Sequence, residues 1–211
     1  IGRAALGTAQ SDSNNVAIGY SALGTQNGAG TAYNVAVGHR ALYQTKASNN
    51  TSIGQDSLYN HVIGDNNVAL GLGAGKTITG GSTPLYSSSF STFIGTSTKA
   101  KADDETNQIV IGYNAIGEGS NSVVLGNDSI TKTLLKGNVT ASGNISASGD
   151  ILTSDDITAL GSINGTIATA TQNSITTATG LTSVGTIGTG TWQGTAIASA
   201  YLDADTAHLS T

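Results

Sequence analysis

Carboxylates are the side chains of this chain best suited to acid–base chemistry, and they gather in three places. The groups are residues 103–105, 155–156 and 203–205. Glycoside hydrolases hold two carboxylates about 5–10 Å apart in a groove. Here the first group stands beside Lys99 and Lys101, and each group falls in a polar stretch typical of a loop or a strand surface. We therefore expect solvated carboxylates and no enzyme.

The sequence signals for metal binding and phosphate binding are no stronger than the signal for carboxylate catalysis. The three histidines, His39, His61 and His208, lack the spacing of a metal site, although a histidine on the axis of a trimer would meet its symmetry copies. Residues 155–156 lack the ligand spacing of a Ca²⁺ loop. Segment 71–77, GLGAGKT, lacks the first glycine and the following helix of a phosphate-binding loop. The sequence predicts no metal and no cofactor.

Tyrosines give a better indication of binding. An exposed tyrosine can stack on a sugar ring and form hydrogen bonds with its hydroxyls. The alternative is that these rings pack over neighbouring parts of the same fold, and the sequence favours this reading. The candidate binding residues are Tyr20, Tyr33, Tyr43, Tyr59 and Tyr86.

A short repeat positions these residues. Its core is Ile-Gly or Val-Gly, and the apolar residues one and three positions before the glycine show the period of two that is typical of a short β-strand. The glycine then ends the strand where a side chain would block a tight corner or a close neighbour. The repeat glycines are Gly19, Gly38, Gly54, Gly71, Gly95, Gly112 and Gly126.

Other repeat positions have their own preferences. Asparagine often stands four residues before the glycine, and we expect it at a corner because it tolerates a left-handed backbone. A small residue and then Leu or Ile follow the glycine, which indicates a second short strand or a corner. Insertions after the Leu, at 24–33 and 77–91, are expected to be outer loops. Residues 62–64, VIG, resemble a copy that is out of step. Since so short a unit cannot bury its own apolar face, consecutive copies must stack, and we place this repeat at 1–130.

A second pattern covers residues 131–166, where one apolar residue recurs every six positions. This column comprises Val139, Ile145, Ile151, Ile157 and Ile163. Burying one such side chain contributes about 1.5–3 kcal/mol, whereas ordering six backbone units costs about 1–2 kcal/mol each. Three chains sharing one axis would bury more surface per residue. We therefore expect a triple-stranded β shaft with this column as the trimer core.

The last region, 167–211, is rich in Thr and Gly and is expected to be irregular β structure, with a short helix as an option for 198–209. We expect the chain to be an internal piece of a longer protein, because it begins inside a repeat and stops without a closing element.

The amino-acid composition argues against two classes of function, nucleic-acid binding and membrane insertion. Only 10 % of residues are charged, the net charge is −5, and there is no cysteine. An acidic chain does not suit nucleic-acid binding, which needs a basic surface. No apolar run approaches the about 18 residues of a membrane span, so no membrane insertion is expected in this segment.

The sequence Asn34-Val35-Ala36-Val37-Gly38 resembles the head repeats of trimeric autotransporter adhesins. Segments 124–133 and 181–195 are more similar to phage tail-fibre and tail-spike shafts. These resemblances imply an all-β, elongated repeat protein that forms a homotrimeric β-roll or β-helix fibre. They imply a structural role in a virion, spacing or presenting host-binding surfaces, with further copies of itself, neighbouring virion proteins and a host surface glycan as partners.

Three alternatives stay open at this point. A trimeric adhesin on a bacterial cell surface is the nearest of them. A polysaccharide-degrading spike would need a convincing carboxylate pair, and an ice-binding solenoid would need a regular ladder of threonines.

Overall fold

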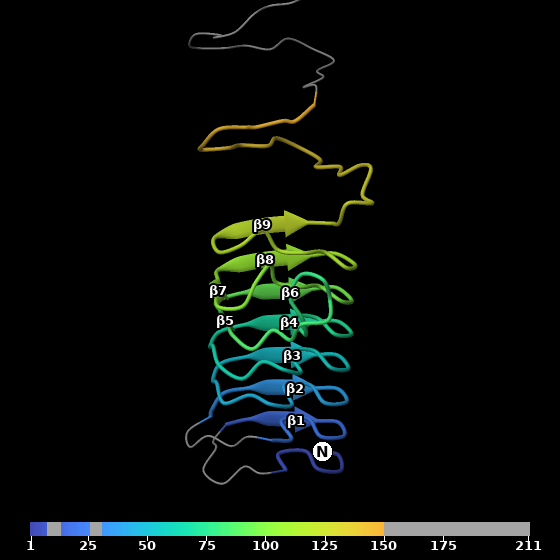
Figure 1. Cartoon of the computed structure of the whole chain (residues 1–211), viewed down its shortest axis with the longest axis vertical. Helices are drawn as coiled ribbons and strands as arrows, with labels where there is room; N and C mark the ends of the chain where they lie inside the picture. Colours follow the sequence, from blue (N-terminus) through green and yellow to red (C-terminus); the bar gives the residue numbers. More distant parts are fainter. Residues whose placement is uncertain (8–13, 26–30, 150–211) are drawn as a thin grey trace, which may run out of the picture. The chain divides into compact units, whose positions relative to one another are not determined.

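The computed structural model describes residues 1–7, 14–25 and 31–149 of the 211-residue chain. Its described part is all-β and contains no helix, as the repeat predicts. Each repeat glycine follows one short strand, and consecutive strands pair in parallel as the chain coils upward (Figure 1). Residues 1–142 make one compact unit with the architecture of a β-solenoid. The main sheet has seven strands: β1 (Val16–Ile18), β2 (Val35–Val37), β3 (Thr51–Ile53), β4 (Val68–Leu70), β6 (Thr92–Ile94), β8 (Gln108–Ile111) and β9 (Ser122–Leu125).

The register of this sheet follows the repeat. Val16 pairs with Val35, and Val35 with Thr51, so equivalent positions of consecutive coils lie directly above one another. This alignment creates ladders of like residues along the solenoid. A position in the repeat therefore defines a column on the structure.

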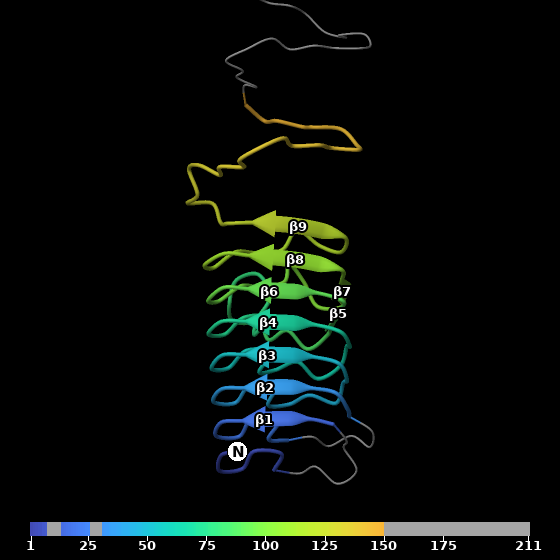
Figure 2. The same ribbon diagram turned by 180° about the vertical axis from the view of Figure 1, so that it is seen from behind.

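A second, smaller parallel sheet lies beside the start of the main strands (Figures 1 and 2). It pairs β5 (Ser88–Ser89) with β7 (Glu105–Thr106). Ile63 extends this column through a parallel bridge to Ser87. The segment 62–64 is thus no displaced copy of the main strand, because its backbone belongs to the second face of the coil.

The segment after each glycine is a corner and not a second strand. Leu23, Leu42 and Leu58 lie in these turns, are fully buried and have positive φ angles near 50°. Each leucine fills the solenoid interior from the turn, where a β-branched residue would be strained. The rest of the core contains many alanines from both the strands and the turns, such as Ala36 and Ala74.

Residues 131–149 contain no strand within the single chain, and 143–149 belong to a separate compact unit. Val139 is 64 % exposed and Ile145 is 71 % exposed. A triple-stranded shaft draws its hydrogen bonds from partner chains, so its formation here stays a prediction. Ile151, Ile157, Ile163 and the region 167–211 lie outside the described residues.

Candidate functional site

The outward surface of the main sheet is apolar. In each three-residue strand of this sheet the middle residue points into the solenoid, and the first and third point out. In the four-residue strand β8, Ile109 and Ile111 point out. Val68 and Leu70, for example, are 41 % and 46 % exposed, while Ala69 between them is fully buried. We call this surface the outer sheet face. It consists of Val16, Ile18, Val35, Val37, Thr51, Ile53, Val68, Leu70, Thr92, Ile94, Ile109, Ile111, Val123 and Leu125.

The chemistry of this face suits association. Twelve of its fourteen residues are aliphatic, and they follow one another from coil to coil with threonine as the only interruption. A contiguous apolar patch of this kind usually marks a protein interface. The apolar residues of the period-two pattern therefore lie on the surface of the solenoid. The residue between them faces the interior and is alanine in β1, β2 and β4.

Asparagines form a ladder inside the coil. The backbone N–H of Asn50 donates to Asn34 Oδ1 at 2.9 Å, and the N–H of Asn67 donates to Asn50 Oδ1 at 2.9 Å. Each of these three side chains is fully buried. The left-handed residue lies one position earlier, as at Asn49 and Asn66. The tolerance of a left-handed backbone, on which the expected corner position of this asparagine rests, is thus used by the preceding residue, while the ladder asparagine pairs the coils.

The repeat glycines lie where consecutive backbones approach closely. Gly38 has φ of 135°, and a Cβ atom there would lie 2.5 Å from the carbonyl oxygen of Gly54. Gly19 and Gly54 repeat this geometry against the glycine of the next coil. Any larger residue would meet a backbone atom that cannot move aside, in a conformation that side chains rarely adopt.

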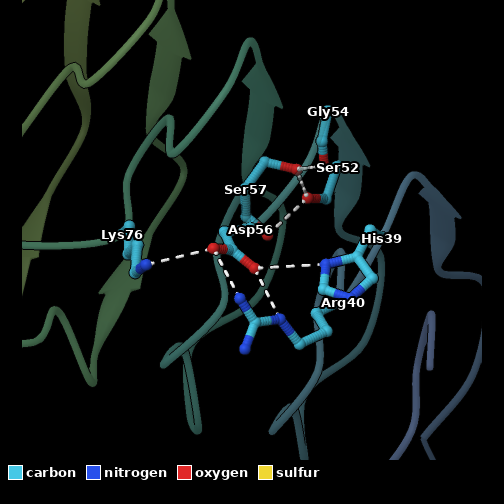
Figure 3. A network of polar contacts seen from close by, with 7 residues as sticks. All are labelled: His39, Arg40, Ser52, Gly54, Asp56, Ser57 and Lys76. Atoms are coloured by element: carbon cyan, nitrogen blue, oxygen red, sulfur yellow. Dashed lines mark hydrogen bonds and ion pairs between the residues drawn. The ribbon is translucent and has the colours of Figure 1, made fainter. Parts of the chain in front are cut away.

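Asp56 is the centre of a charged network on the turns (Figure 3). Its side chain is 10 % exposed. Arg40 Nε lies 2.8 Å from Asp56 Oδ1, Arg40 Nη2 donates to Oδ2 at 2.9 Å, and Lys76 Nζ donates to Oδ2 at 3.1 Å. His39 Nδ1 is 3.9 Å from Oδ1. The network links three consecutive coils, and its one carboxylate is matched by two permanent cations.

Four of the candidate binding tyrosines differ in their surroundings. Tyr43 and Tyr59 stack on each other with ring centroids 5.2 Å apart, and Tyr20 stacks on His39 at 5.4 Å. These contacts join neighbouring coils, as the packing alternative expects. Tyr33, in contrast, is 62 % exposed and has no stacking partner among the described rings.

The fifth candidate, Tyr86, is 46 % exposed and lies beside the carboxylate group at 103–105. Asp103 Oδ1 accepts hydrogen bonds from the backbone N–H groups of Tyr86 and Ser87, both at 2.8 Å. The carboxylate thereby fixes the loop that leads into β5. Residues 155–156 and 203–205 lie outside the described part of the chain.

His61 is a buried polar group within the second face of the coil. Its Nε2 accepts a hydrogen bond from the Ser88 backbone N–H at 3.2 Å, and its Nδ1 has no hydrogen-bond partner among the described residues. Burial lowers the pKa of His61 from 6.5 to about 4, although the Ser88 carbonyl and nearby Asp103 and Asp65 act in the opposite direction. The ring is therefore neutral at physiological pH.

The described residues contain no group of three or more His, Asp or Glu side chains arranged to hold a metal ion. Within residues 1–7, 14–25 and 31–149, no helix has the length and apolarity to span a bilayer.

Comparison with protein-family models, curated proteins and solved structures found no match to this chain.

Sequence reasoning assigned neither Lys99 nor Gly73 to a site near Asp56. Lys99 occupies the turn position that holds a buried leucine in other coils, and Gly73 occupies the column of Asp56. Both are departures from the repeat, and such departures are the signal that could have identified them.

Proposed function

We propose that this chain is a segment of a homotrimeric structural fibre, a virion tail-fibre shaft that spaces or presents host-binding surfaces. The outer sheet face carries the proposal. Eight of its aliphatic residues are more than a third exposed in the single chain: Val16, Ile18, Ile53, Val68, Leu70, Ile109, Val123 and Leu125. Further copies of the chain would cover this face.

The energetics favour an assembly that buries the whole face. Full burial of an aliphatic side chain contributes about 1.5–3 kcal/mol, so burying the exposed half of each contributes about 1 kcal/mol. The contribution is repeated in five of the seven strands, namely β1, β3, β4, β8 and β9. A flat face with no charged side chain along seven strands has no polar groups that would resist dehydration.

A parallel cyclic arrangement fits the repeat. Three parallel copies related by a threefold axis would place equivalent strands of the three chains at the same height. Each level would then contain the same two outward side chains from each of the three copies. The six-residue pattern at 131–166 predicts the same symmetry, since one apolar residue per six needs shared burial. The resemblance to fibre shafts and adhesin head repeats supports three copies as the number.

The oligomeric state tests this proposal. Light scattering coupled to size exclusion should give three chains per particle at micromolar concentration. Ile109→Lys places a charge on the outer sheet face of β8 and should yield monomers or unfolded chains. The matched control, Thr106→Lys, adds the same charge to exposed β7 of the second sheet and should leave the trimer intact.

Two results would contradict the proposal. A folded monomer of the unaltered chain at this concentration would show that the apolar face needs no partner. Equal assembly of Ile109→Lys and Thr106→Lys would place the interface elsewhere.

A further inference from the structure

A hollow of about 260 Å³ opens on the turn side of the solenoid, next to the Asp56 network. It lies where the repeat is broken at two positions in successive coils. Gly73 stands at the repeat position that Asp56 holds in the preceding coil, and it has no side chain there. Lys99 stands at the repeat position where other coils have a buried leucine, such as Leu58. Further lining comes from Asp56, Lys76 and Asn114. Departures from a repeat that converge on one cavity indicate a site, because a purely structural coil has no need of them.

Gly73 creates the space. It stands two residues after Gly71, the place taken by Arg40, Asp56, Ser97 and Asn114 in other coils. A Cβ atom on Gly73 would have its nearest neighbours at 4.0 Å, on Lys76 and Ser97, so no packing contact demands a glycine. Its φ of 61° is one that asparagine also adopts. The missing side chain therefore leaves a gap in an otherwise continuous column.

Lys99 supplies an unmatched positive charge at this gap. The residue is only 9 % exposed. Its Nζ donates to the Ser97 carbonyl at 3.1 Å and to Asn114 Oδ1. An ammonium group has three donors, so one is left for a ligand, and no carboxylate of the described residues forms an ion pair with it. A buried cation normally requires an anionic partner.

Lys76 provides a second cation on the hollow. Its Nζ uses one donor on Asp56 Oδ2, and Asp56 also pairs with Arg40. Arg40, Lys76 and Lys99 thus stand against the one carboxylate of Asp56, in a chain whose net charge is −5. The hollow is a positive spot on an acidic protein.

We propose that this hollow binds the carboxylate of an acidic saccharide. The free donors of Lys76 and Lys99 would hold the two carboxylate oxygens, and side chains such as Thr77 and Asn114 would pair with the ring hydroxyls. The choice of a saccharide rests on the proposed host-recognition role, whereas the preference for an anion rests on the two lysines. Every lining residue comes from one chain, so each copy carries a complete site.

Saturation-transfer NMR with glucuronic acid, and with glucose as the neutral counterpart, tests the assignment. Glucuronic acid should bind and glucose should not. Lys99→Leu restores the leucine of the repeat, so it should fold at least as well as the natural chain while weakening binding by about tenfold or more. Gly73→Asn should also fold and should block the hollow. Lys101→Leu is the control, because it removes an exposed lysine that pairs with Glu118 outside the hollow.

The outcomes separate this inference from the proposed fibre. Binding lost in Lys99→Leu and Gly73→Asn but kept in Lys101→Leu supports the site. Absence of glucuronic acid binding, equal binding in Lys99→Leu, or binding of inorganic phosphate without glucuronic acid overturns it. Light scattering on the same samples reports the trimer independently, so a failed site leaves the oligomer measurement intact.

Discussion

Gly38 illustrates at the scale of one residue why the repeat tolerates so little change at its glycine. The corner that Gly38 makes sits directly against the same corner of the next coil, and the two backbones are separated by no side chain. The requirement is both steric and conformational, since a φ of 135° is accessible almost only to glycine.

Replacing this glycine should therefore be costly. Gly38→Ala is expected to destabilise the fold by about 3 kcal/mol or more, through the strained backbone and the contact with Gly54. Thermal unfolding followed by circular dichroism measures the change. Gly143→Ala is the control, because nothing lies within 4 Å of a Cβ at that exposed glycine. Equal melting temperatures for the two variants would refute the steric account.

His61 makes stability depend on pH. Its folded-state pKa is lowered to about 4, so the neutral ring stabilises the fold fully above pH 6.5, and this contribution is lost as the pH falls through 6.5 toward 4. The loss should reach about 3 kcal/mol per chain at pH 4. Chemical denaturation at pH 7 and pH 4 measures it.

A variant without the titrating ring isolates this effect. His61→Gln should lose less stability between pH 7 and pH 4 than the natural chain, by about the same 3 kcal/mol. An unchanged pH dependence in His61→Gln would show that protonation of this ring does not limit acid stability.

At the scale of the element, each coil was predictable in part. The short strands before each glycine follow from the period of two, and the parallel stacking follows from the repeat itself. The sequence pattern did not show which side chains point into the solenoid, because a period of two defines two faces of a strand without saying which face is buried. Phe93 shows a further limit, since it fills the interior where Gly75 replaces the usual leucine, and only the three-dimensional register brings the two together.

The candidate site was less accessible to sequence reasoning. Asp56 and Lys76 are 20 residues apart, and nothing in the local pattern joins them. Their pairing depends on the number of residues in each coil, which varies between repeats. The tyrosines were recognisable as candidates by type, but their stacking on neighbours depends on the same register.

The loop between β4 and β5 is an element with its own anchor. Leu85 is fully buried and lies in an insertion that also bridges Thr77 to Pro84. Leu85→Ala should release this loop at a local cost of about 2–4 kcal/mol, because it removes a large, fully buried side chain. Hydrogen exchange should increase around Ile78, whose N–H donates to Thr83.

Exchange in the main sheet should not change in this variant. The exposed Thr83→Ala serves as the control and should leave the loop protected. If hydrogen exchange in Leu85→Ala increased equally in the loop and in the main sheet, the insertion would be part of the solenoid core and not an appended element.

At the scale of the whole molecule, the proposed trimer would account for the two patterns of the chain. The outer sheet face leaves aliphatic rows uncovered, and the six-residue column leaves Val139 and Ile145 exposed in the single chain. In both patterns a single chain leaves apolar side chains exposed, because no other part of the described chain covers them. Further copies of the chain would cover both, and the six-residue column would then line a trimer axis.

Ile145→Asn tests whether the six-residue column forms that axis. In a trimer the substitution would place three polar groups in one buried layer, and each group left unpaired would cost about 1–3 kcal/mol. Unfolding of the trimer in denaturant should shift to a lower midpoint. Ser146→Asn is the matched control, since the neighbouring side chain of an extended strand points to the opposite side. Equal midpoints for the two variants would place Ile145 on the outside of the assembly, because an exposed asparagine is fully hydrated, and would overturn its place on that axis.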